Sequence, residues 1–389
     1  MPGALPGLLV ALTPLSQLGF IPVSVVLGER WGLSVEQVGL SVGVYAAAAA
    51  VGTVLLGPLF DLVSPRRVLP VAVVLNVLLS GSLLTDPGFA GIVLARVLTG
   101  VTGSALVLCA VVVVADGHRD DPSARERGFS RLQTSTSVGA AVGLALGAAA
   151  AGLGAPAVWA WVVVGYGVLV LALTPAFVRR MPSGAALPGT SPTARLHALA
   201  ADVHGALRAP RTVFLLLAGA AVGWAIQTAH YTVSLVSQQA GPGLGQRVLL
   251  AVLIPLGVFA GASLDEVLLT RAAAVRVFAR AYPALPVAAA AVLAGVASGS
   301  AVVQVLALVG LGVALGVLMP LGPAVVVGWY PDLRGSVSAA ESVSKALGST
   351  VGPVVLGAVA SGTTLAGGFA VAVAVTLLGA WCARVSARS

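Results

Sequence analysis

Two short stretches of the sequence repeat a glycine, an acid and a base at the same spacing. They are "GPLFDLVSPRR" and "GASLDEVLLTR", and the shared residues are Gly57, Asp61 and Arg67 in the first and Gly261, Asp265 and Arg271 in the second. A carboxylate is stabilised beside the N-terminus of a neighbouring helix, where unpaired N–H groups and the helix dipole favour negative charge. Such a contact can form in one conformation and break in another. The repeat therefore favours a conformational gate over residues that only anchor helix ends at a membrane surface.

Polar residues that could contact a solute or a proton occur inside long apolar runs. Many of them recur three or four residues apart, which places them on single helix faces. We predict that the following residues line a pathway: Gln17, Tyr45, Arg96, Trp224, Gln227, His230, Tyr231, Glu341 and Lys345. Hydrogen bonds between helices are the alternative role for the uncharged members, and each such bond contributes only about 0.6 kcal/mol on average in lipid.

For the ionisable members of this set, the sequence predicts specific positions and partners. Arg96 is predicted to lie about 10 Å deep, and an arginine within a span costs about 2.5–3.5 kcal/mol on insertion scales. It should therefore face the interior, unless its side chain extends to the outer headgroups. Glu341 and Lys345 are four residues apart and can pair with each other. Proton movement would require Glu341 or His230, because no other carboxylate is predicted near mid-membrane.

The composition indicates which elements must position these residues. Of the 389 residues, 58 % are hydrophobic and only 9 % are charged, whereas soluble domains are roughly 25 % charged. A chain crosses the hydrocarbon core as a helix of about 20 apolar residues, because each peptide group then finds its hydrogen bond within its own segment. We therefore predict an all-α membrane protein.

Twelve windows of suitable length predict twelve transmembrane helices. They cover about residues 5–27, 34–56, 67–84, 89–115, 128–150, 156–178, 212–236, 246–264, 276–296, 300–329, 335–359 and 362–383. Arginine supports the even number, because seventeen arginines fall in one set of connections and only Arg30 and Arg247 in the other. This positive-inside bias predicts a multi-pass protein of the cytoplasmic membrane with both termini in the cytoplasm. It also explains the net charge of +8 without a nucleic-acid partner.

A break between Arg179 and Arg211 divides six predicted helices from six. It is rich in Ser, Pro and Gly and contains a predicted amphipathic helix on the membrane surface, with a disordered tether as the alternative. We predict an N-terminal six-helix bundle over 1–180, a cytoplasmic linker over 181–210 and a C-terminal six-helix bundle over 211–389. Glycine pairs at a spacing of four, Gly139/Gly143 and Gly348/Gly352, predict close helix packing in two pseudo-symmetric halves.

The sequence resembles the Major Facilitator Superfamily over essentially its whole length. The likeness rests on the six-plus-six spans, the central loop and a motif G-x-L-x-D…R-R, carried here by Gly57, Leu59, Asp61, Arg66 and Arg67. Leu62 stands where the family usually has a basic residue. In the family this motif holds the inward gate, and its basic residues pair with an acid at the end of span 4, where this chain has Asp116. Arg96 and Gly100 in "ARVLTG" are similar to a second family signature.

The resemblance implies a secondary active transporter that moves a small organic solute by alternating access. Proton-coupled efflux is the preferred form, because the likeness is nearest to twelve-span drug exporters, and import of a small metabolite is the alternative. An intramembrane enzyme or a non-transporting sensor is a weaker alternative, since neither an H-E-x-x-H spacing nor a G-x-S-x-G elbow occurs in a suitable setting. The expected partners are a small-molecule substrate, the lipid bilayer and protons as coupling ion. We expect a monomer without a cofactor or metal.

Overall fold

The computed structural model describes residues 4–62, 65–117, 122–180, 204–239, 243–269, 274–330, 334–362 and 365–388. The first half contains α1 (Ala4–Trp31), α2 (Val35–Leu62), α3 (Pro65–Gly81), the 3-10 helix η1 (Ser82–Thr85), α4 (Gly88–Gly117), α5 (Pro122–Gly152) and α6 (Pro156–Arg180). The second half contains α8 (Pro210–Gln239), α9 (Leu244–Leu269), α10 (Ala274–Ala281), α11 (Ala284–Ser298), α12 (Ala301–Trp329), α13 (Arg334–Gly362) and α14 (Leu365–Arg388). No strand occurs among these residues.

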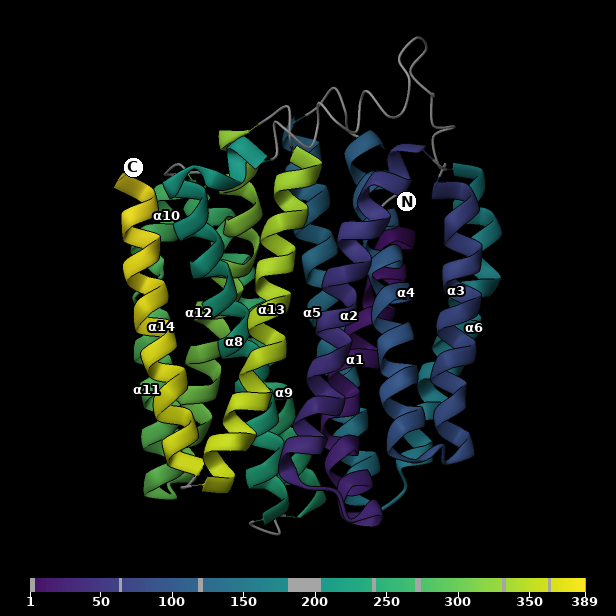
Figure 1. Cartoon of the computed structure of the whole chain (residues 1–389), viewed down its shortest axis with the longest axis vertical. Helices are drawn as coiled ribbons and strands as arrows, with labels where there is room; N and C mark the ends of the chain where they lie inside the picture. Colours follow the sequence, from purple (N-terminus) through teal and green to yellow (C-terminus); the bar gives the residue numbers. More distant parts are fainter. Residues whose placement is uncertain are drawn as a thin grey trace.

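The helices run side by side, as membrane-spanning helices must (Figure 1). Within the described ranges, 11 spans are long and apolar enough to cross a membrane, and α9 adds a shorter apolar stretch, Val248–Leu264. Each of the twelve predicted windows therefore has its helix, with η1 extending α3 and with α10 and α11 sharing one span. The start of α1 and the end of α14 lie at the same end of the molecule. We call this the terminal end, and the opposite one the far end.

The ninth predicted span is broken, although the sequence predicts one continuous helix there. Its two parts, α10 and α11, meet at Tyr282 and Pro283. Proline has no N–H to donate and restricts the residue before it, so a helix ends or bends at such a position. The Tyr282 hydroxyl donates to the Ala218 carbonyl of α8 at 2.6 Å. The break thus coincides with an attachment of this span to α8.

The same pairs of helices pack closely in each half. In the first half, α5 lies against α1, and in the second half α13 lies against α8. Side chains at Gly139 and Gly143 would collide with the α1 backbone at Ala11 and Leu15. Likewise, a side chain at Gly348 would collide with the α8 backbone at Ala220. The glycine pairs therefore allow the close approach that the sequence predicts, because helices in lipid associate through packing.

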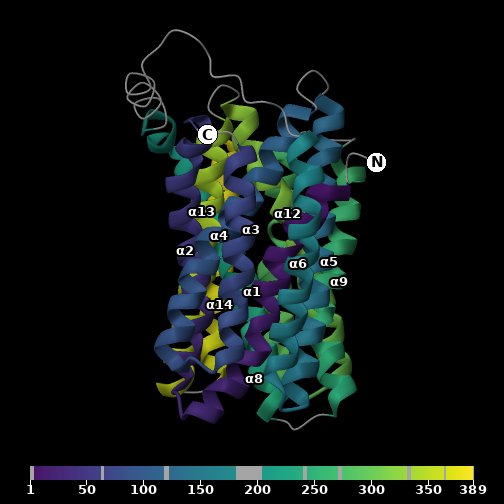
Figure 2. The ribbon, with the colours of Figure 1, turned by 90° about the vertical axis from the view of Figure 1, so that its right-hand side faces the viewer.

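Two clusters of buried apolar residues form the interior, one mainly in each half. The halves meet where α2 packs on α13 and where α5 packs on α9. Figures 1 and 2 both show α2 beside α13. A side chain at Gly43 on α2 would meet the Thr350 carbonyl oxygen of α13 at 2.8 Å, and one at Gly39 would meet that of Pro353 at 3.1 Å. This close contact lies in the part of α2 nearest the far end. Residues 181–203 of the predicted linker lie outside the described ranges, so the division at 1–180, 181–210 and 211–389 stays a prediction.

Candidate functional site

The predicted gating residues lie largely outside the part of the chain whose side chains are described. This holds for the side chains of Asp61, Asp116 and Asp265 and for the whole of Arg271, and Gly57 belongs to the same segment as Asp61. Arg66 is half-buried and Arg67 is exposed at the start of α3. Gly261 is buried where α9 meets α12, and a side chain there would crowd Val313 and Gly316. Gly261 thus has a packing role, and the gate itself stays a prediction.

Arg96 lies inside the N-terminal bundle and does not extend to the headgroups. Only 2 % of the residue is exposed. The guanidinium carbon lies 4.4 Å from the ring centroid of Phe20 on α1 and 4.4 Å from that of Tyr45 on α2. Such contacts attract a cation to the faces of the rings. The predicted interior position of Arg96 matches this structure.

The guanidinium of Arg96 also reaches the backbone of α1. Nη1 donates to the carbonyl of Ser16 at 3.3 Å, and Nη2 donates to that of Gln17 at 3.4 Å. Nε has no hydrogen-bond partner, and no ion pair of Arg96 occurs among the described residues. The side chain is therefore a buried cation with at least one unused donor.

A small polar group surrounds this cation. The hydroxyls of Tyr45 and Thr13 are buried without hydrogen-bond partners. A side chain at Gly103 would touch both residues, with Cζ of Tyr45 and Cγ2 of Thr13 each at 3.4 Å. Gln17 is only partly buried, although α1 is surrounded by other helices. The neighbouring helices thus leave the polar face of α1 partly uncovered at Gln17.

The C-terminal bundle holds an ion pair. Oε2 of Glu341 lies 3.0 Å from Nζ of Lys345, one turn further along α13, and their side chains are 2 % and 20 % exposed. Nζ of Lys345 also donates to the Met319 carbonyl of α12 at 3.4 Å. The predicted pairing of these two residues is present. Because the pair is neutral as a unit, its burial costs much less than burial of either charge alone.

Helix α8 carries buried polar groups on the face that it turns towards this ion pair. Gly219, Gly223, Gln227 and His230 follow one another at helical spacing and share a face. A side chain at Gly219 would lie 3.5 Å from Oε1 of Glu341, which directs this face towards the pair. Gln227 and His230 are 2 % and 3 % exposed, and neither Nε2 of Gln227 nor the ring nitrogens of His230 make a hydrogen bond. Buried polar groups normally find partners, so this cluster is unusual.

Trp224 and Tyr231 have different surroundings on the same helix. The Tyr231 hydroxyl donates to the Val35 carbonyl of α2 at 2.9 Å, so it links the two bundles near the far end. Trp224 is buried, and its Nε1 donor has no partner. The structure therefore gives Tyr231 a bridging role between bundles, whereas Trp224 keeps an unused donor in the interior.

Phe20 is the contact that the sequence reasoning missed. It lies four residues after Ser16 and three after Gln17, so helical spacing places it on their face. Only its apolar character excluded it from the set of polar candidates. Its ring covers the Arg96 guanidinium and lies 5.8 Å from the ring of Trp159 on α6.

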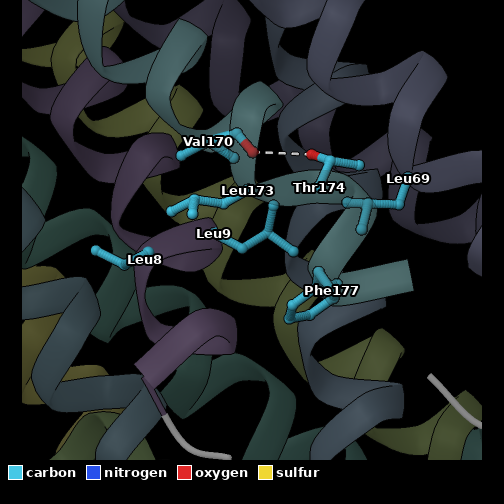
Figure 3. A pocket seen from close by; sticks show the side chains of 7 residues that line it. All are labelled: Leu8, Leu9, Leu69, Val170, Leu173, Thr174 and Phe177. Atoms are coloured by element: carbon cyan, nitrogen blue, oxygen red, sulfur yellow. Dashed lines mark hydrogen bonds between the residues drawn. The ribbon is translucent and has the colours of Figure 1, made fainter. Parts of the chain in front are cut away.

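A small hollow at the terminal end lies away from these polar residues. Leu8, Leu9, Leu69, Val170, Leu173, Thr174 and Phe177 line it, from α1, α3 and α6 (Figure 3). Its volume is about 10 Å³, and the Thr174 hydroxyl is already bonded to the Val170 carbonyl at 2.9 Å. A space of this size holds at most one water molecule. It is too small for an organic solute.

Comparison with known proteins establishes the family. The sequence model of the Major Facilitator Superfamily matches residues 7–313. The chain belongs to this family. It is therefore a membrane transporter of small solutes and not an enzyme. None of the curated proteins matches the sequence.

Solved structures of the same fold cover nearly the whole transporter. The nucleoside transporter NupG, in a mutant form, has a TM-score of 0.79 at 12 % identity, over 99 % of this chain and 100 % of its own. A bacterial homologue of the human lysosomal transporter Spinster, inward-facing and occupied, has a TM-score of 0.78 at 15 % identity, over 99 % and 96 %. The human organic anion transporter MFSD10 has a TM-score of 0.74 at 19 % identity, over 98 % of each chain. At sequence identities this low, the structural similarity establishes the fold alone.

Proposed function

We propose that this transporter exports a small organic solute from the cytoplasm in exchange for protons. The observation that carries the proposal is the buried pair of Glu341 and Lys345, 3.0 Å apart. Protonation of Glu341 would remove its negative charge and leave Lys345 without a counter-ion. The pair could therefore exist in two charge states, and each state would favour a different arrangement of the helices around it.

The neighbours of the pair support a coupled movement. Lys345 also bonds the Met319 carbonyl on α12, and Gly219 places α8 against Glu341. A change in the pair would thus act on three helices at once. Both α8 and α13 also contact α2 of the N-terminal bundle. Tyr231 of α8 bonds the Val35 carbonyl, and α13 packs against Gly43. A protonation event in one bundle could in this way alter the contact between bundles.

The proposed direction and orientation rest on the sequence. The arginine asymmetry places the terminal end in the cytoplasm, and the likeness to drug exporters favours efflux over import. In this proposal Asp61, Arg66, Arg67 and Asp116 close the cytoplasmic side, with Asp265 and Arg271 as their counterparts. The solved structures of the same fold include a nucleoside transporter, a bacterial homologue of a lysosomal transporter and an organic anion transporter, so the fold does not select the solute.

Transport into inside-out vesicles tests the proposal. Untargeted mass spectrometry would first identify solutes that are depleted in cells expressing the protein. Everted vesicles should then accumulate those solutes when the lumen is acidic, and less when a protonophore removes the gradient. Glu341→Gln should abolish the dependence on the gradient, whereas Glu29→Gln, at an exposed carboxylate on α1, should keep it. Accumulation that ignores the gradient, or that requires an alkaline lumen, would contradict proton-coupled export.

A further inference from the structure

Arg96 is a buried positive charge that the described chain does not neutralise. The residue is 2 % exposed, and its bonds are to two backbone carbonyls and two aromatic rings. A buried charge without a counter-ion is costly, even where hydrogen bonds and rings compensate in part. A counter-ion supplied by a ligand would remove this cost.

No acid in the described ranges is placed to serve as that counter-ion. Glu29 and Glu36 are exposed near the far end, and Asp86 is paired with Arg30 at 2.8 Å. Asp116 is 20 residues further along α4 than Arg96, about 30 Å by helical rise. Asp61 is 16 residues beyond Tyr45 on α2, about 24 Å. The other acids, apart from the paired Glu341, either lie outside the described ranges or belong to the first turns of α5 or the last turns of α9.

The C-terminal bundle also contains buried hydrogen-bond donors without partners. Nε1 of Trp224 and Nε2 of Gln227 are buried, have no partner and can only donate. Among the described residues, the unpartnered acceptors that cannot donate are Oδ1 of Asn76, on α3 and away from the C-terminal bundle, and Oε2 of Glu341, which lies 3.0 Å from Nζ of Lys345. The ring nitrogens of His230 are also unpartnered, and a neutral ring offers one donor and one acceptor. Arg96 is therefore the buried charge without a counter-ion in the described ranges, and Trp224 and Gln227 add unused donors.

We propose that the solute carries a carboxylate and that Arg96 binds it. This inference rests on the proposed transport function and specifies its substrate class. Nε is the donor of the guanidinium that has no partner, and a charge-assisted hydrogen bond from a guanidinium to a carboxylate oxygen is about twice as strong as one between neutral groups. One uncompensated positive charge balances a single negative charge, so a monoanion fits better than a dianion. The rings of Phe20 and Tyr45, each 4.4 Å from the guanidinium carbon, hold this cation in place.

Binding to the purified full-length protein tests this inference without measuring transport. The probes are a panel of monocarboxylates from acetate to 1-naphthylacetate, each with its primary amide and primary amine. At least one carboxylate should raise the midpoint of thermal unfolding, because a ligand stabilises the state that binds it. Its amide should give a smaller shift, and its amine none.

Substitutions at Arg96 connect the shift to this residue. Arg96→Gln should raise the half-saturating carboxylate concentration about tenfold or more, since a charged hydrogen-bond donor is lost. Arg96→Lys should give an intermediate value, because it keeps the charge but loses the planar edge. Arg30→Gln, at an exposed arginine on α1, is the matched control and should bind as the unmodified protein does.

Two results would overturn the inference. One is a panel in which no carboxylate shifts the midpoint or in which amines shift it more. The other is a carboxylate shift that Arg96→Gln leaves unchanged. If Arg96→Gln fails to fold, Arg96→Lys alone decides, since its half-saturating concentration must rise. Because the readout is binding, its failure leaves proton-coupled export open, and failure of the vesicle assay leaves carboxylate binding open.

Discussion

The two bundles share a scaffold but handle buried charge differently. In each, glycines bring one helix against the backbone of another, at Gly143 in α5 and at Gly348 in α13. The C-terminal bundle neutralises Lys345 with Glu341 at 3.0 Å. The N-terminal bundle holds Arg96 between two rings and provides no ion pair for it in the described chain. The close packing is thus alike in both halves, whereas the arrangement of buried charge differs.

Under the proposed function, this difference gives each half a separate role. The close approach of two helix backbones depends only on the absence of a side chain at a few positions. Substitutions elsewhere therefore leave this packing intact. Charge depends on single side chains and can change independently in each half. Under the proposed function, the neutral pair responds to protons and the lone cation responds to the solute. The following substitutions break or sharpen the comparison, from the largest expected effect on stability to the smallest.

Adding side chains at the glycines of the close helix contacts should have the largest effect on stability. Gly143→Val and Gly348→Val each place a branched side chain against the backbone of the neighbouring helix. We expect both variants to lose most folded protein, measured by size-exclusion chromatography after extraction in detergent. Gly165→Val is the control, because a side chain at Gly165 meets nothing within 4 Å. Normal yield of only one of the two would show that the halves do not depend equally on these glycines.

Breaking the ion pair should have the second-largest effect. Glu341→Ala leaves Lys345 without its counter-ion, and loss of one partner of a buried pair costs about 3–5 kcal/mol. The Lys345 side chain is 20 % exposed, so we expect the lower part of that range. The double variant Glu341→Ala with Lys345→Met should regain stability, because no charge then remains buried. A double variant as unstable as Glu341→Ala in a thermal unfolding assay would refute the pairing.

Loosening the contact between bundles should have a smaller effect. Tyr231→Phe removes the bond to the Val35 carbonyl and should cost about 0.6 kcal/mol, the average for such bonds in lipid. We expect faster labelling of a cysteine introduced at Thr350, on the face of α13 that meets Gly43 of α2. Tyr166→Phe, which loses a bond to Leu8 within the N-terminal bundle, is the control. Equal labelling of both variants would mean that Tyr231 does not hold the bundles together.

Removing the lone cation should change stability least. Arg96→Met keeps a long side chain between the rings of Phe20 and Tyr45 but removes the charge. The lost hydrogen bonds and ring contacts are offset by the removal of a buried charge, so the unfolding midpoint should stay near that of the unmodified protein. Lys345→Met should instead lower it, because Glu341 would remain unpaired. A strong loss of stability in Arg96→Met would show that Arg96 is mainly a packing element.

Much of the fold could be predicted from the sequence, because apolar runs and arginine asymmetry are properties of single segments. All twelve spans have their helices, and the pair of Glu341 and Lys345 forms as its spacing of four predicts. The break at Pro283 was missed because an apolar window is insensitive to one proline. The ring of Phe20 over Arg96 was missed because it joins residues 76 positions apart, and no local pattern marks such a contact.

The sequence by itself determined the membrane, the number of crossings and the positions at which helices can approach closely. These follow from hydropathy and from the presence or absence of a side chain, which do not depend on the rest of the chain. Only the tertiary structure decided which charge is paired and which is not. That outcome depends on which helix faces which, and it places Arg96 on the α1 backbone and the rings of α1 and α2, and Lys345 between Glu341 and α12.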